Sequence, residues 1–268
     1  TCYGRENVIN FEIAENYRMD DLLGIMELLR APGGCPWDRA QTHRSIRQNM
    51  LEEAYEAADA IDRMDMANLK EELGDVLLQV VFHASMAGEA GQFTFDDVVD
   101  GVCKKLVYRH PHVFGTVEVE DSREVLANWE ALKRKEKSQA TTADAIEAVP
   151  HTLPALWRAE KIGSKTAKAG FDWSGPLSAL GKLEEEVREL RQALEAGAAA
   201  DGPHGVREEL GDLLFITAKV AQMSGVDPED ALHRACDKFD ARFRRAEARA
   251  DKPLDRCSLE ELTALWQA

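Results

Sequence analysis

The sequence has few cysteines, and none of them are paired at a spacing typical of a zinc site. The five cysteines are odd in number and far apart: Cys2, Cys35, Cys103, Cys236 and Cys257. This pattern excludes a disulfide framework and is typical of reduced thiols in a cytoplasmic protein. The first residues also lack a basic stretch followed by an apolar core, so we expect no secretory signal.

Long apolar runs and positive charge are also lacking. No apolar run reaches the ~18 residues that a membrane span needs. Lysine and arginine number 33 against 49 aspartates and glutamates, which gives a net charge of −16. Because nucleic acids and anionic membranes bind basic surfaces, we expect neither as a partner. A phosphate ligand is compatible with this charge only if carboxylates hold a cation, which reverses the local field.

Alternating β-branched runs are scarce, and the sequence contains no P-loop, G-x-G-x-x-G or G-x-S-x-G motif. Apolar residues recur instead at helical spacing, for example along residues 22–29, 76–84 and 213–220. A chain of 268 residues with 44% hydrophobic content can bury one large core or two ordinary ones. We therefore predict an all-α fold with a helical bundle in each half.

An acidic pattern occurs twice in the chain. E-E-x-x-E at residues 52–56 precedes E-E-L-G-D at 71–75, and the same pair of motifs returns at 185–189 and 208–212. Downstream, K-x-x-x-R also recurs, as Lys105 with Arg109 and Lys238 with Arg242. The recurrence indicates a tandem duplication of a unit of roughly 110 residues.

The repeat sets the domain boundaries that we predict. Residues 19–132 and 151–268 are the two repeated domains, and residues 133–150 form a polar linker that leads to Pro150. Residues 1–18 do not resemble the rest, and we expect them to be an extension outside the fold.

The acids of each repeat are spaced to meet on a helical hairpin. Glu53 and Glu56 share one helix face, and Glu72 and Asp75 share a face of the next helix, after a turn near residues 64–66. In an antiparallel hairpin the two pairs lie at a similar height. A single E-E-x-x-E is commonly a solvated helix face, but four converging carboxylates repel one another unless a cation lies between them.

We therefore predict a divalent metal site in each repeat. The ligands are carboxylates from both helices of each hairpin: Glu53, Glu56, Glu72 and Asp75 in the first repeat, and Glu186, Glu189, Glu209 and Asp212 in the second. Histidine is absent from both sets, and all-oxygen ligands favour Mg²⁺, with Mn²⁺ as a substitute. The chemistry that follows is metal-assisted attack by water, with a carboxylate as general base.

Other residues have two open interpretations. Each K-x-x-x-R pair could hold a phosphate chain or form a solvated ion-pair face. Trp37 and Trp173 could stack on a base or simply pack. The repeated Gly74 and Gly211 suggest a close backbone approach between Leu and Asp.

Taken in order, these motifs resemble a known family. Residues 34–38 (Gly-Cys-Pro-Trp-Asp), the two acidic sets, 109–114 (Arg-His-Pro-His-Val-Phe) and 170–173 (Gly-Phe-Asp-Trp) are together similar to MazG, the two-domain nucleoside triphosphate pyrophosphohydrolases. The resemblance covers about residues 19–267. It implies an all-α, Mg²⁺-dependent, cytoplasmic homodimer that cleaves NTPs or dNTPs to the monophosphate and pyrophosphate, cleansing the nucleotide pool.

The resemblance also implies roles for residues of the C-terminal repeat, as the main catalytic unit. Its catalytic carboxylates are Glu185, Glu186, Glu189, Glu209 and Asp212, of which the last four hold the metal. The nucleotide site is lined by Lys182 and Glu185, with phosphates at Lys238 and Arg242 and the base near Trp266. Two alternatives stay open: a narrower hydrolase for dNTPs or oxidised nucleotides, and a non-catalytic dimer that binds NTP·Mg²⁺ as a sensor or scaffold.

Overall fold

The computed structural model describes residues 11, 13–119, 121–136, 139–197 and 201–267, and every regular element in these ranges is a helix. The all-α prediction is therefore confirmed. The chain divides into two compact units between Trp129 and Glu130. Of the predicted N-terminal extension, residues 1–10 and 12 lie outside the described residues. Among the described helices, none is long and apolar enough to cross a membrane.

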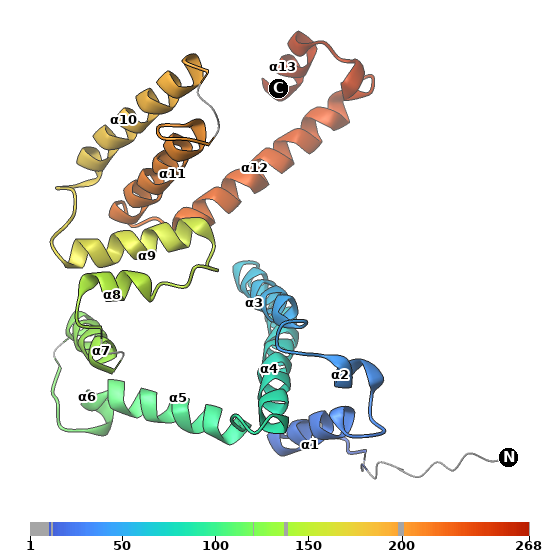
Figure 1. Cartoon of the computed structure of the whole chain (residues 1–268). Helices are drawn as coiled ribbons and strands as arrows, with labels where there is room; N and C mark the ends of the chain where they lie inside the picture. The colour runs from blue at the N-terminus through green and yellow to red at the C-terminus, as the bar shows by residue number, and fades with distance from the viewer. Residues whose placement is uncertain (1–10, 12, 120, 137–138, 198–200, 268) are drawn as a thin grey trace. The chain divides into compact units, whose positions relative to one another are not determined.

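The N-terminal unit is built on a long helical hairpin (Figure 1). Its helices are α1 (Met19–Arg30), α2 (Pro36–Ala40), α3 (Arg47–Asp62), α4 (Met66–Glu89), α5 (Phe95–Arg109), α6 (Pro111–Phe114) and α7 (Ser122–Glu136), which runs past the division. The turn between α3 and α4 places Met64 at φ +55°. Asp65 then caps α4 by accepting hydrogen bonds from the backbone N–H groups of Ala67 and Asn68. Helices α3 and α4 pack against each other along this turn, which confirms the predicted hairpin.

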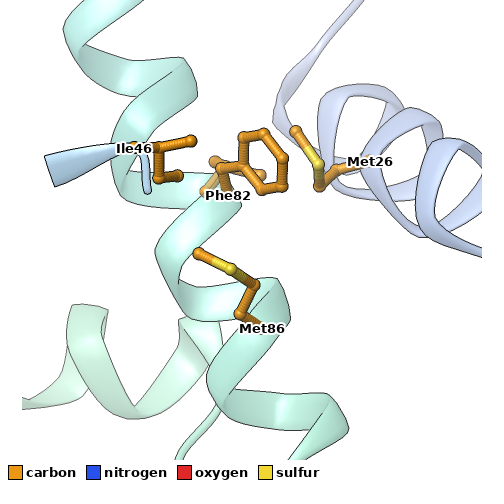
Figure 2. Close-up of a cluster of buried hydrophobic side chains, with 5 residues drawn as sticks. Met26, Ile46, Phe82 and Met86 are labelled. Atoms are coloured by element: carbon orange, nitrogen blue, oxygen red, sulfur yellow. The ribbon is translucent and has the colours of Figure 1, made fainter. Parts of the chain in front are cut away.

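The core of this unit lies where α1 meets the C-terminal half of α4. Figure 2 shows Phe82 of α4 beside Met26 of α1, and Ile46, Val81 and Met86 complete the cluster. Met26 and Ile46 are both 2% exposed. The cluster fixes α4 against α1, while the acid-bearing turns of the α3–α4 hairpin lie nearer its other end.

The C-terminal unit repeats the helical hairpin of the N-terminal unit. Its elements are α8 (Thr142–Glu147), α9 (Ala155–Lys168), α10 (Pro176–Glu195), α11 (Val206–Met223), α12 (Pro228–Arg249), a 3₁₀ turn at Leu254–Arg256 and α13 (Leu259–Gln267). Helices α10 and α11 form the hairpin and α9 packs against α11. The predicted linker, residues 133–150, thus contains the end of α7 and all of α8. α12 has 22 residues whereas its counterpart α5 has 15.

An ion pair with a buried ammonium joins α11 to the segment that follows α9. The ammonium of Lys219, whose side chain is 3% exposed, lies 2.7 Å from a carboxylate oxygen of Asp172. It also donates to the side-chain oxygen of Gln222 at 2.8 Å and approaches the carbonyl of Gly163 at 3.4 Å. A side chain at Gly163 would crowd the stem of Lys219, because a Cβ there would lie 3.3 Å from its Cδ.

The predicted close backbone approach at Gly74 and Gly211 is wrong for contacts within this chain. A Cβ placed on Gly74 or Gly211 would meet no described atom within 4 Å beyond its own neighbourhood. No backbone of the same chain therefore approaches these glycines closely. Both lie on exposed turns of the hairpins, between the acids.

Candidate metal and phosphate site

The N-terminal hairpin brings three of its four predicted ligands into one group. Carboxylate oxygens of Glu53, Glu72 and Asp75 all lie within 4.8 Å of one another. Desolvation and the nearby charge of Asp75 raise the pKa of Glu53. The pKa of Glu72 is raised by desolvation and by Glu56, the fourth acid, which shares a hydrogen bond with it. These carboxylates repel one another, which is the electrostatic situation that a bound cation relieves.

The C-terminal hairpin groups the corresponding acids more deeply. Glu186 of α10 and Glu209 of α11 are each 4% exposed, and their carboxylate oxygens lie within 4.8 Å of each other and of Asp212. Glu189, one turn after Glu186, shares a hydrogen bond with it, and desolvation raises the pKa of Glu189. All four predicted ligands are therefore joined, directly or through Glu186.

A lysine distinguishes this set from the N-terminal one. The ammonium of Lys182 lies 2.8 Å from a carboxylate oxygen of Glu186, 3.1 Å from one of Glu185 and 4.0 Å from one of Glu189. The hydrogen bond to Glu186 raises the pKa of Lys182 above its ordinary value. At the repeat offset of 133 residues, the N-terminal hairpin carries Asn49 in its place. The two hairpins therefore present similar carboxylates with different countercharge.

His204 is a neighbour of the acids that we did not include among the site residues. It lies in the turn before α11 at φ +55°, and its Nδ1 lies 3.3 Å from Glu209. Its backbone N–H donates to the carboxylate of Glu208 at 2.7 Å. A histidine five residues before a ligand has no helical spacing relation to it, so only the folded turn reveals the contact.

The predicted phosphate-binding cations lie in a second cluster. On α12, the guanidinium of Arg242 lies 4.9 Å from the centre of the Trp266 ring, which also contacts Phe239 with ring centres 5.0 Å apart. Within the described part of the C-terminal unit, no hydrogen bond or ion pair joins Lys238, Arg242 or Trp266 to the acids of the hairpin. The fold thus assembles two groups, an acidic one and a cationic–aromatic one.

The N-terminal unit repeats the cationic–aromatic pair. The guanidinium of Arg109, which is 7% exposed, lies 5.2 Å from the ring centre of Trp129. Trp129 therefore plays the part in this unit that Trp266 plays in the other, although the two tryptophans are 137 residues apart and not 133, so only the folded contacts reveal the relation. Lys105 is exposed on the same helix, α5. Of the two other tryptophans considered, Trp37 is 59% exposed and Trp173 is half-buried.

The C-terminal acids suit an oxygen-loving divalent cation. Two of the carboxylates are buried, and burial of several like charges is unfavourable without a cation among them. The donors are all carboxylates, the ligands that Mg²⁺ and Mn²⁺ prefer, apart from the imidazole of His204 at the edge. Beside a metal held here, Lys182 could add positive charge toward an anionic substrate.

Comparison with known proteins identifies the architecture. The model of the MazG nucleotide pyrophosphohydrolase domain matches residues 41–114 and again residues 174–245. The nucleoside triphosphate pyrophosphohydrolase of Escherichia coli K12 is 43% identical over 254 residues, covering 93% of this chain and 96% of that protein. The nucleoside triphosphate pyrophosphohydrolase/pyrophosphatase MazG of Thermotoga maritima is 41% identical over 251 residues, covering 92% and 94%. The nucleoside triphosphate pyrophosphohydrolase of Mycobacterium tuberculosis is 44% identical over 159 residues, covering 58% of this chain and 46% of that protein.

Proposed function

Because this chain belongs to the MazG nucleotide pyrophosphohydrolase family, we propose that it hydrolyses nucleoside triphosphates to the nucleoside monophosphate and pyrophosphate, and that its C-terminal unit is the main catalytic unit. The observation that carries this assignment is the buried carboxylate group of the α10–α11 hairpin with Lys182 against it. House-cleaning of the nucleotide pool is the role that we attach to this activity.

In this proposal Glu186, Glu209 and Asp212 hold a divalent metal, with Glu189 as the fourth ligand. The donor set favours Mg²⁺, and Mn²⁺ can substitute. When bound, such an ion neutralises phosphate charge and acts as a Lewis acid toward the phosphoanhydride. The equivalent set of the N-terminal unit, Glu53, Glu56, Glu72 and Asp75, is a second candidate metal site.

The chain's own residues then bind and orient the substrate. Lys182 holds the carboxylates of Glu185 and Glu186 at fixed positions along α10 and presents its ammonium to the phosphate chain. A carboxylate of the group accepts the proton of the attacking water, which makes the water a better nucleophile. Lys238 and Arg242 bind phosphate oxygens, and Trp266 packs near the base.

We also propose that the protein is a homodimer. In the C-terminal unit most of the buried apolar residues among those described are alanines: five alanines stand beside Val149, Ile216 and Pro228. Larger ones stay exposed on the hairpin, with Leu180, Val187 and Leu194 seven residues apart along one stripe of α10. Leu210 and Leu214 of the partner helix α11 are also exposed. A second copy of the hairpin, packed stripe to stripe, completes a four-helix bundle.

Sedimentation of Val187→Glu/Leu194→Glu tests the dimer. The buried charges oppose the interface, so the variant sediments as a monomer while wild type sediments as a dimer. Leu259→Glu is the control, because Leu259 is 80% exposed on α13. A dimer that persists in the stripe variant contradicts the proposed surface.

We also propose a cytoplasmic location. The unpaired cysteines among the described residues, Cys35, Cys103, Cys236 and Cys257, support it.

Pyrophosphate release from a panel of NTPs and dNTPs with Mg²⁺ tests the function. Glu186→Gln/Glu189→Gln removes two ligand charges with little change in shape, and we expect activity to fall by at least 10²-fold. Glu53→Gln/Glu56→Gln is the matched pair in the N-terminal unit and retains most of the activity. Loss confined to the N-terminal variant reverses the assignment of units. If the wild-type protein binds nucleotide but releases no pyrophosphate, the result supports the alternative of a sensor or scaffold.

A further inference from the structure

Positive charge on α12 extends beyond the pair already assigned to phosphate binding. Lys238, Arg242, Arg245 and Arg249 lie four, three and four residues apart. At 100° per residue these four side chains fall within about 60° of one another. At 1.5 Å per residue the stripe is about 16 Å long, whereas Lys238 and Arg242 alone span about 6 Å.

None of the four cations in this stripe forms an ion pair with a described residue. Arg244 instead pairs with Asp240 at 2.8 Å, on the opposite side of the helix. A row of cations without paired carboxylates is unusual in a chain of net charge −16. Such a row attracts anions.

The row also forms one wall of a defined pocket. Arg242, Arg245 and Arg249 line a cavity of about 140 Å³ with Leu265, Trp266 and Gln267 of α13. The ring of Trp266 contacts Arg242 and Phe239, so packing of α13 on α12 holds this wall in place. Among the described residues, no carboxylate lines this pocket.

The N-terminal repeat lacks the same feature. At the repeat offset of 133, Arg245 and Arg249 correspond to His112 and Thr116. Helix α5 ends at Arg109, before both positions, whereas α12 continues to Arg249. The pair of arginines is therefore an addition to the C-terminal copy and not a general part of the repeated unit.

We propose that Arg245 and Arg249, with Arg242 and the Trp266 wall, form an anion subsite that binds a phosphoanhydride group. Guanidinium forks bind phosphate oxygens in pairs, and three of them spread over about 10 Å of helix suit two linked phosphates better than one. The occupant is either released pyrophosphate or the phosphate chain of a bound nucleotide. The inference rests on the proposed function only for the source of this group.

Isothermal titration with pyrophosphate, in metal-free buffer with a chelator, tests the subsite without turnover. We compare wild type, Arg245→Gln/Arg249→Gln and the control Arg244→Gln, with circular dichroism to check that each is folded. We expect wild type to bind pyrophosphate more tightly than orthophosphate. The double variant loses at least tenfold in pyrophosphate affinity, and the control stays within twofold of wild type. Equal binding by all three proteins, equal losses in both variants, or no binding by wild type overturns the proposal.

A second titration distinguishes the two sources of the phosphate chain. An NTP analogue with a non-hydrolysable α,β bridge is added to the same proteins. If the double variant loses affinity for the analogue as well, the subsite holds the chain of the bound nucleotide. If only pyrophosphate binding falls, it holds the released product, and product inhibition weakens in parallel. Because no step requires hydrolysis, the subsite can be supported when the proposed function fails, and refuted when that function holds.

Discussion

Replacing Asp172 with alanine should destabilise the C-terminal unit strongly. The carboxylate of Asp172 is the only acidic partner, among the described residues, of the Lys219 ammonium, which is 3% exposed. Without it the charge stays buried against two neutral acceptors, on Gln222 and Gly163. Removing one partner of a buried ion pair typically costs about 3–5 kcal/mol. Because Asp172 itself is 27% exposed, we expect the lower end, about 3 kcal/mol.

Urea unfolding followed by circular dichroism and tryptophan fluorescence measures this loss. The control is Asp240→Ala, which breaks the exposed pair with Arg244 and should cost less than about 1 kcal/mol. The double variant Asp172→Ala/Lys219→Met should recover at least half of the lost stability, because it replaces a buried charge with an apolar side chain of similar length. A loss at Asp172 no larger than at Asp240, or no recovery in the double variant, refutes the reasoning.

Three further outcomes follow from the described contacts. Phe82→Ala should lower the free energy of unfolding of the N-terminal unit by about 3–5 kcal/mol in urea titrations, because it empties the centre of the core cluster. The hydrogen bond from Arg30 holds the pKa of Glu89 below its usual value. This pair therefore stabilises the fold above about pH 4.5, and its contribution is lost as the pH falls further. Glu89→Gln should flatten the fall in Tm between about pH 5 and 3. Gly163→Leu should destabilise the C-terminal unit by about 1–3 kcal/mol in thermal unfolding, because its side chain crowds Lys219.

The sequence by itself determined the fold class and the family. Helical periodicity and the spacing of the acids are local properties of the chain, and they predict a hairpin with a turn near residues 64–66, where α3 ends and α4 begins in the structure. The order of the motifs was specific enough to identify the family, which the comparisons confirm. Roles of individual site residues remain predictions.

Burial and the contacts between distant residues were decided by the tertiary structure alone. Glu53 and Glu186 occupy equivalent positions in the repeat, yet Glu186 is almost fully buried and Glu53 only partly. The contact of His204 with Glu209 depends on a turn whose path no periodicity describes. The Lys219–Asp172 pair joins residues 47 positions apart, and such contacts arise only when whole helices pack. A pattern along the chain fixes which face a residue shares, whereas its solvent exposure and its partners depend on what the rest of the chain places against that face.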